Sequence, residues 1–158
     1  MNQADNELRF DTGQVAVKHS FFADLLGMCF TLGRTIYLSK GCYGMYLATG
    51  KQPDGILFHE YRHFEQQRDV GLVKFLVMYL LCLPALWNPW RRRWELEAYR
   101  VSIAFRLGNS LGLSSGYQQY LAEMLSSWRY GWMMRRAEAE QWVREAVQEL
   151  KGEVSRWK

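Results

Sequence analysis

Residues 56–67 read Ile-Leu-Phe-His-Glu-Tyr-Arg-His-Phe-Glu-Gln-Gln and contain the pattern H-E-x-x-H at His59, Glu60 and His63. On an α-helix, side chains at positions i and i+4 lie one above the other, so both imidazoles can reach one metal ion. Glu60 stands beside them in the position of a general base. The stretch therefore predicts a central helix that supplies two zinc ligands and a base. Because catalytic zinc usually has three protein ligands, we expect one more elsewhere in the chain.

The length and composition of the chain fit one domain. With 158 residues, 49% of them hydrophobic, the sequence can bury a substantial core but is short for two domains. We expect a polar N-terminal arm over residues 1–18 and a single domain over residues 19–158. Residues 1–10 contain no apolar run of the kind found in secretory signal peptides, which predicts a cytoplasmic protein.

The charged residues and the cysteines argue against two classes of protein. The formal charge of +4 is modest, and the short basic clusters lie outside any nucleic-acid-binding motif, so we expect no specific nucleic-acid partner. The three cysteines, Cys29, Cys42 and Cys82, are odd in number and sparse. That pattern is typical of reduced thiols and not of a disulfide framework.

The longest apolar run covers residues 75–87 and contains Pro84. A helix of this length spans roughly 20 Å, which is short of the roughly 30 Å of a bilayer core. The run therefore predicts a buried helix. Contact with a membrane surface is the less favoured alternative.

Other sequence patterns predict a sheet beside the motif helix. Apolar residues 21–31 predict a short helix. Residues 33–40 mix β-branched and aromatic residues between glycines and predict a strand, with a second strand over residues 43–47. The expected fold class is therefore mainly α (α+β), a helical domain with one small β-sheet.

Capping residues predict where the main helices begin. Asp54 is the expected N-cap of the motif helix, which should end near residue 70. Asn88 followed by Pro89 should begin a helix that reaches residue 107. Further helices are expected over residues 72–83, 116–128 and 133–157. After the motif, Gln66, Gln67 and Arg68 continue the helix as a polar face that either supports the metal ligands or contacts solvent, and contact with solvent is the preferred interpretation.

Four sets of residues compete for the position of the third metal ligand. Asp69 is rejected, because an unbroken helix places it about 120° around the axis from His63. Cys42 and His19 remain weaker candidates, since nothing in their surroundings indicates a site. The remaining candidates are two acidic residues, Glu95 and Glu97, on the helix that follows Asn88 and Pro89.

The pattern of that helix favours Glu95 over Glu97. Trp94 and Ala98 belong to an apolar stripe, and Glu95 lies beside both. Glu97 lies across from the stripe among arginines, where an ion pair is the simpler expectation. Glu95 is therefore the preferred third ligand, with Glu97 as the alternative.

Two stretches after the motif carry a family resemblance, Trp87-Asn-Pro89 and Glu95-Leu-Glu-Ala-Tyr99. Over about residues 33 to 107 the chain resembles gluzincin metallopeptidases, in which an H-E-x-x-H helix precedes a second helix with a glutamate ligand in a pattern like E-x-x-A-D. The resemblance implies a zincin-like domain that holds one Zn²⁺ through His59, His63 and Glu95. Tyr99 stands where that family has an acidic residue, so any group that orients a ligand imidazole must come from elsewhere.

The resulting prediction is a zinc-dependent metallopeptidase that acts on a peptide or protein, with Glu60 as general base for hydrolysis. Hydrolysis also needs a donor that stabilises the oxyanion, and four tyrosines are chemically able to serve: Tyr99, Tyr117, Tyr120 and Tyr130. None is assigned from the sequence. The alternatives are a zincin-fold scaffold without turnover and a protein associated with a membrane surface.

Overall fold

The computed structural model describes residues 14–51, 54–81, 88–109 and 113–155. In chain order its elements are β1 (Ala16–His19), α1 (Phe21–Leu26), β2 (Phe30–Leu32), β3 (Thr35–Leu38), α2 (Lys40–Ala48), α3 (Gly55–Val70), α4 (Leu72–Leu76), the π-helix η2 (Val77–Leu81), α5 (Pro89–Gly108), α6 (Ser115–Ser126), the 3₁₀ turn η4 (Trp128–Tyr130) and α7 (Arg136–Ser155). The expected fold class, mainly helical with one small sheet, is confirmed.

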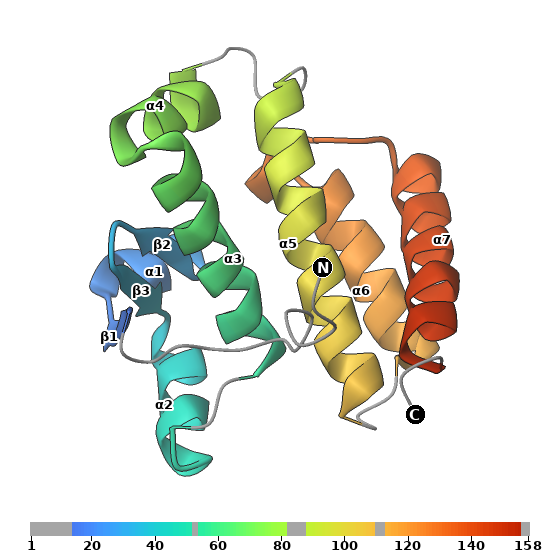
Figure 1. The fold of residues 1–158 in the computed structure, drawn as a ribbon, viewed down its shortest axis with the longest axis horizontal. Helices are drawn as coiled ribbons and strands as arrows, with labels where there is room; N and C mark the ends of the chain where they lie inside the picture. Colours follow the sequence, from blue (N-terminus) through green and yellow to red (C-terminus); the bar gives the residue numbers. More distant parts are fainter. Residues whose placement is uncertain (1–13, 52–53, 82–87, 110–112, 156–158) are drawn as a thin grey trace, which may run out of the picture.

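Helix α3 lies at the centre of the arrangement. In Figure 1 the sheet and α2 lie on one side of α3, and α5, α6 and α7 follow one another on the other side. Buried Ile36 and Leu38 of β3 pack with Leu57 and Phe64 of α3. Helices α5, α6 and α7 enclose a second core that includes Ile103. The helix that carries H-E-x-x-H is therefore held from both sides.

The sheet contains three strands in the order β1-β3-β2. Strand β1 runs parallel to β3, with Ala16 opposite Thr35, and β2 runs antiparallel to β3. The predicted strand within residues 33–40 is confirmed as β3. Residues 16–18 belong to β1, whereas the sequence analysis placed them in the polar arm. A strand this short carries too little periodicity to be recognised before its partner is known.

Two predictions about the segment before α3 were wrong. Residues 43–47 form part of helix α2 and not a second strand. The first backbone amide of α2, Lys40 N, donates to the Asp24 carboxylate at 2.5 Å, so an acceptor from α1 satisfies this helix end. The helix expected over residues 21–31 ends at Leu26, because Gly27 adopts the left-handed conformation and Phe30 begins β2.

The capping predictions for α3 and α5 are confirmed. The Asp54 side chain accepts a hydrogen bond from Leu57 N, and the Asn88 side chain accepts from Trp90 N and Arg91 N. The two helices are joined near the start of α3, where Ser102 Oγ donates to Gly55 O at 2.6 Å. These contacts fix how the histidines of α3 face α5.

The segment predicted as a buried helix over residues 72–83 is described up to Leu81. It consists of α4 and the π-helix η2, and it buries Phe75 while leaving Val77 and Leu80 exposed. Burial is therefore confined to one face. Residues 82–87, with Pro84, lie outside the described part of the chain. Within the described ranges, no helix has both the length and the apolar content needed to cross a bilayer.

Candidate metal centre

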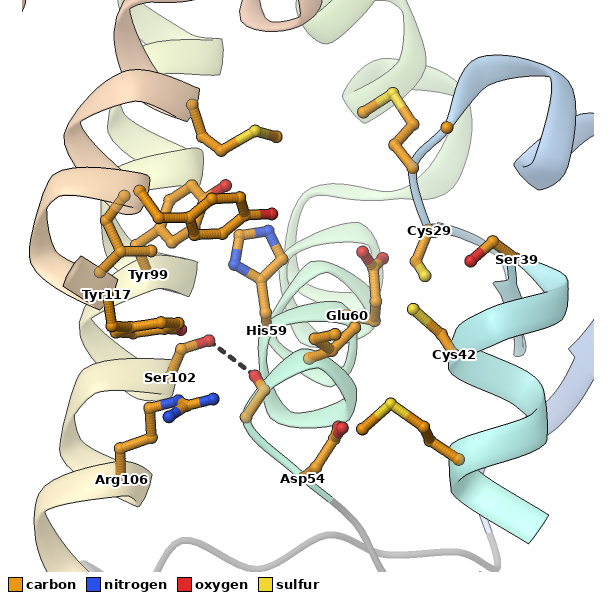
Figure 2. Close-up of a pocket in the computed structure, with 18 of the residues that line it drawn as sticks. Cys29, Ser39, Cys42, Asp54, His59, Glu60, Tyr99, Ser102, Arg106 and Tyr117 are labelled. Atoms are coloured by element: carbon orange, nitrogen blue, oxygen red, sulfur yellow. Dashed lines mark hydrogen bonds between the residues drawn. The ribbon is translucent and has the colours of Figure 1, made fainter. Parts of the chain in front are cut away.

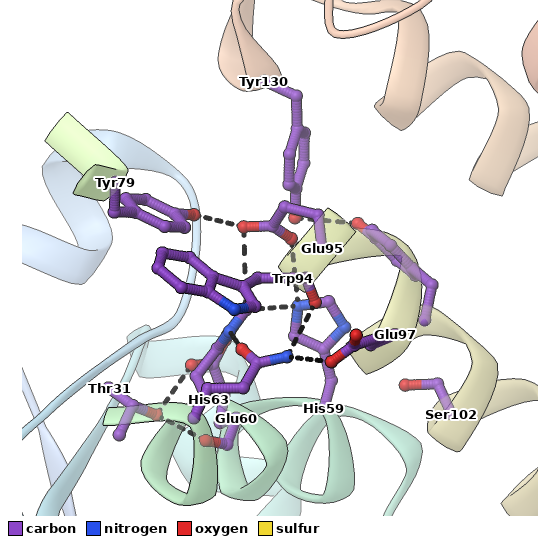
Figure 3. Close-up of polar contacts among 12 residues, drawn as sticks. Thr31, His59, Glu60, His63, Tyr79, Trp94, Glu95, Glu97, Ser102 and Tyr130 are labelled. Atoms are coloured by element: carbon purple, nitrogen blue, oxygen red, sulfur yellow. Dashed lines mark hydrogen bonds and ion pairs between the residues drawn. The ribbon is translucent and has the colours of Figure 1, made fainter. Parts of the chain in front are cut away.

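Two histidines and a glutamate meet between α3 and α5 (Figure 3). His59 and His63 come from one face of α3, and Glu95 reaches them from α5; all three are buried. The two Nε2 atoms are 3.2 Å apart. His59 Nε2 is 3.4 Å from Glu95 Oε2, and His63 Nε2 is 3.6 Å from Glu95 Oε1. The group could hold a metal ion.

The spacing of these atoms and the state of Glu95 both fit a bound cation. Ligand atoms that lie about 2.0 to 2.2 Å from a tetrahedral ion are about 3.3 to 3.6 Å from one another, close to the distances between these three side chains. Glu95 Oε2 is buried and makes no regular hydrogen bond within the described ranges, although His59 Nε2 lies 3.4 Å from it. A buried carboxylate oxygen left without a donor is costly, and a cation would offset that cost.

Burial and charge act in opposite directions on the three side chains. Burial disfavours protonation of His63, but the Glu95 carboxylate outweighs it and raises the pKa of His63 to about 9. Burial likewise opposes ionisation of Glu95, yet His63 and His59 hold the pKa of Glu95 well below its ordinary value. In the absence of metal, the carboxylate therefore attracts a proton to the imidazole of its partner.

Gln66 holds His63 in the orientation that a ligand requires. Its Oε1 atom is 2.9 Å from His63 Nδ1, and its Nε2 atom donates to Trp94 O and to Glu97 Oε2, each at 3.1 Å. With Nδ1 occupied by this contact, Nε2 is the ring nitrogen that a metal ion beside Glu95 would use. The interpretation of Gln66 and Gln67 as a face in contact with solvent was wrong, because both are 3% exposed.

Tyr79 of η2 fixes the third side chain of the group. Its hydroxyl donates to Glu95 Oε1, and burial followed by the Glu95 charge raises the pKa of Tyr79 well above its ordinary value. The phenol therefore stays protonated and remains a donor. Asn88 joins this arrangement to the start of α5, since its Nδ2 atom donates to Met78 O at 2.6 Å. The N-cap of α5 thus also positions η2 beside the metal group.

Glu60 is buried next to His59 and is held by the edge strand β2. Thr31 Oγ1 lies 2.8 Å from Glu60 Oε2 and 2.9 Å from the Glu60 backbone oxygen, and the hydroxyl can donate to either. The carboxylate faces away from the helix axis toward Cys29 (Figure 2). The base predicted from the sequence therefore has a defined orientation and 4% exposure.

Two cavities meet at the metal group. One has a volume of about 350 Å³ and is lined by His63 and Glu95 together with His59, Glu60 and Tyr130. The other, of about 240 Å³, is shown in Figure 2, and its lining also includes His59, Glu60 and Tyr130. The same three side chains therefore border both cavities.

The weaker candidates for the third ligand lie away from the group. His19 Nε2 is 2.7 Å from Asp24 Oδ2, Cys42 faces Cys29, and exposed Asp69 pairs with Arg68. None of His19, Cys42 and Asp69 belongs to the buried cluster. The structure therefore brings together the residues preferred from the sequence.

Glu97 takes a supporting position beside the cluster. It pairs with Arg93 at 2.9 Å and with Arg62 at 3.3 Å, and it accepts from Gln66. Burial opposes its ionisation, but these partners hold the pKa of Glu97 below its ordinary value. The negative charge of Glu97 is therefore balanced by two arginines. Its connection to the histidines is indirect, through the hydrogen bonds of Gln66.

Two supporting residues, Thr31 and Tyr79, were not identified from the sequence, and support by Gln66 was only the less favoured of two interpretations. Only Gln66 left a local signal, because it stands three positions after His63 and so lies on the same helix face. Thr31 and Tyr79 reach the site because β2 and η2 pack beside α3 and α5. A pattern of neighbouring residues in the sequence cannot predict such packing.

No protein-family model matches the chain, and comparisons with curated proteins and with solved structures found no match. The arrangement of the site is therefore the basis on which its function is inferred.

Proposed function

We propose that the protein is a zinc-dependent metallopeptidase of the gluzincin type. The observation that carries the proposal is the buried cluster of His59, His63 and Glu95 with an acidic residue, Glu60, next to the first ligand and lining the same cavities. Two imidazoles and one carboxylate are a common protein ligand set for catalytic zinc, which keeps a fourth position open. Zinc bound in this way acts as a Lewis acid and activates water for hydrolysis at neutral pH.

Glu60 serves as the general base in this proposal. It accepts a proton from the attacking water and returns it to the leaving amine. The hydrogen bond from Thr31 keeps the carboxylate at the junction of the two cavities, where a substrate would lie. Because Thr31 can instead donate to the Glu60 backbone oxygen, the carboxylate is able to exchange that bond for a bond to water.

Tyr130 is the residue best placed to stabilise the oxyanion. It lines both cavities, and its hydroxyl oxygen accepts a hydrogen bond from Tyr99 Oη at 2.7 Å. With Tyr99 as the donor in that bond, the Tyr130 proton is free for another acceptor, and burial together with Tyr99 raises the pKa of Tyr130 well above its ordinary value. The phenol therefore stays protonated and can donate to a developing negative charge.

The lining of the larger cavity favours substrates with apolar side chains. Besides the metal group, its walls include apolar residues from β2, α4 and η2: Phe30, Leu32, Phe75, Leu76 and Leu80. A substrate strand cannot pair with the middle of the outer edge of β2, because the backbone groups there already have partners. The Gln67 amide already donates to Thr31 O at 2.9 Å and accepts from Gly33 N at 2.8 Å. Side-chain pockets thus govern substrate binding here.

The substitution Glu60→Gln separates metal binding from turnover. Purified wild-type protein and the variant are compared for zinc content and for cleavage of fluorogenic peptides with apolar residues at the scissile bond. We expect unchanged zinc content and a rate lowered by about 10²–10⁴-fold, because an amide cannot accept the proton.

The matched control is Glu65→Gln, which removes another carboxylate from α3 that pairs with Arg62 at 3.0 Å. It should retain both zinc and cleavage. Cleavage that persists in Glu60→Gln, or that resists a chelator in the wild type, would contradict the proposal.

A further inference from the structure

Two cysteines lie together in the wall of the cavity next to Glu60. Cys29 directly precedes β2, Cys42 lies in the first turn of α2, and both are free thiols of intermediate exposure. Figure 2 shows their sulfur atoms pointing toward each other across the wall of the cavity.

The two thiols are chemically unequal. Hydrogen bonds from Cys29 and Ser39 outweigh burial and lower the pKa of Cys42 to about 6. The bond to Cys42 and burial together raise the pKa of Cys29 above its ordinary value. Cys42 is therefore the more acidic thiol of the pair and the one that ionises first. Exposed thiolates with a neighbouring thiol are the usual arrangement of reactive cysteine pairs.

We propose that Cys29 and Cys42 form a reversible disulfide, a redox modification site that controls the cavity next to Glu60. The oxidant is a small-molecule disulfide, RSSR. The Cys42 thiolate attacks one sulfur, and a thiolate leaves and takes up a proton. Cys29 then loses its proton and attacks the Cys42 sulfur, and the second thiolate leaves. Two protein thiols and RSSR thus give one protein disulfide and two RSH.

The position of the pair determines what the disulfide would change. A disulfide brings its two sulfur atoms to about 2.05 Å, so the bond would join the first turn of α2 covalently to the segment before β2. Thr31, two residues after Cys29, holds the Glu60 carboxylate at 2.8 Å. The cross-link therefore draws together the wall of the smaller cavity next to the base. Its effect on hydrolysis rests on the proposed function, whereas its formation does not.

Peptide mapping of the full-length protein tests the disulfide without any substrate. The native protein is incubated with oxidised glutathione, alkylated, cleaved after Lys and Arg, and analysed by mass spectrometry. Cleavage separates Cys29, Cys42 and Cys82 into residues 19–34, 41–51 and 75–91. We expect a cross-link between residues 19–34 and 41–51 that dithiothreitol removes. Absence of this cross-link, or cross-links that involve residues 75–91 in its place, would overturn the proposal.

Single variants test the order of the reaction and its effect. Cys82→Ser is the matched control and should form the same cross-link as the wild type. Cys29→Ser should stop at glutathione bound to Cys42, and Cys42→Ser should lose the cross-link. Circular dichroism checks that each variant is folded. If either is not, peptide mapping of the wild type and Cys82→Ser still shows whether the disulfide forms. Oxidation should reversibly reduce peptide cleavage in the wild type; a disulfide that forms without this loss would contradict control of the cavity.

Discussion

At the scale of single residues, the site depends on side chains that hold the three proposed ligands in place. Gln66 bonds His63 Nδ1 and links it to Trp94 O and Glu97 on α5. Gln66 therefore supplies the contact that orients the His63 ring. The Tyr99 ring packs against the His59 ring, with 4.5 Å between the centroids.

The substitution Gln66→Ala should lower zinc affinity about 10–100-fold, because His63 loses the partner that fixes its tautomer and rotation. Competition with a chromophoric chelator measures the change. Gln67→Ala is the control, since Gln67 is equally buried but bonds β2. It should lower the melting temperature while its zinc affinity stays near that of the wild type. Equal zinc affinities for the wild type and Gln66→Ala would show that Gln66 does not orient a ligand.

Tyr130→Phe should reduce kcat by about 10²–10³-fold with little change in zinc content, because only the donor to the oxyanion is removed. Steady-state kinetics with a fluorogenic peptide measures the effect. The control variant Tyr120→Phe removes another phenol hydroxyl from the lining of the smaller cavity. Tyr120 is 52% exposed, whereas Tyr130 is buried. That control should retain most of the activity. Similar losses in both variants would mean that Tyr130 has no specific role.

The sequence was informative about the ligands for a simple reason. The spacing of His59 and His63 is a local property of one helix, and the choice of Glu95 follows from the apolar stripe of another. The contacts from Thr31 and Tyr79 join segments distant in the chain, so no local pattern contains them. Glu97, left open from the sequence, is distinguished by its pairing with Arg62 of α3, which only the packed structure shows.

At the scale of elements, helix caps were the most reliable signals. Asp54 and Asn88, the two caps expected from the sequence, accept hydrogen bonds from the first turn of the helix they precede, and Ser114 does the same for α6. The strand expected over residues 43–47 was wrong for the opposite reason. Its aromatic and apolar residues suit a strand, but α2 begins where Asp24 of α1 accepts a bond from Lys40 N. A tertiary contact overrode the local preference.

Asn88→Ala and Ser114→Ala should separate capping from site assembly. Each substitution removes an N-cap and should lower the free energy of unfolding by about 1 kcal/mol. Asn88 also donates to Met78 O, next to Tyr79, so Asn88→Ala should in addition weaken zinc binding. Chemical denaturation of the metal-free proteins and zinc titration measure the two effects. Equal zinc affinities in both variants would show that the cap does not position η2.

At the scale of the whole molecule, the site joins the sheet side of the fold to the helical side. α3 carries the histidines, α5 carries Glu95, and η4 brings Tyr130 to the same cavities. The clustering of these side chains therefore requires the complete packing of the described chain. It also places a buried carboxylate against two imidazoles, which links the protonation of the site to stability.

The metal-free protein should lose stability as pH rises from about 6.5 through about 9. The pKa of His63 is raised from 6.5 to about 9 in the folded state, so its protonated form stabilises the fold fully below 6.5 and not above 9. The full loss is on the order of 3 kcal/mol. Urea unfolding in a chelator across this pH range measures it. Glu95→Gln removes the charge responsible and should flatten the dependence; an equal slope in that variant would contradict this cause.

Zinc content tests the central claim most directly. Elemental analysis of protein purified without added chelator should find about one zinc per chain in the wild type and in Glu97→Gln, whose carboxylate lies outside the cluster. His63→Ala and Glu95→Ala, checked for folding by circular dichroism, should lose it. A wild-type protein that binds no zinc even after zinc is supplied, or folded His63→Ala and Glu95→Ala variants that keep a full equivalent, would contradict the account.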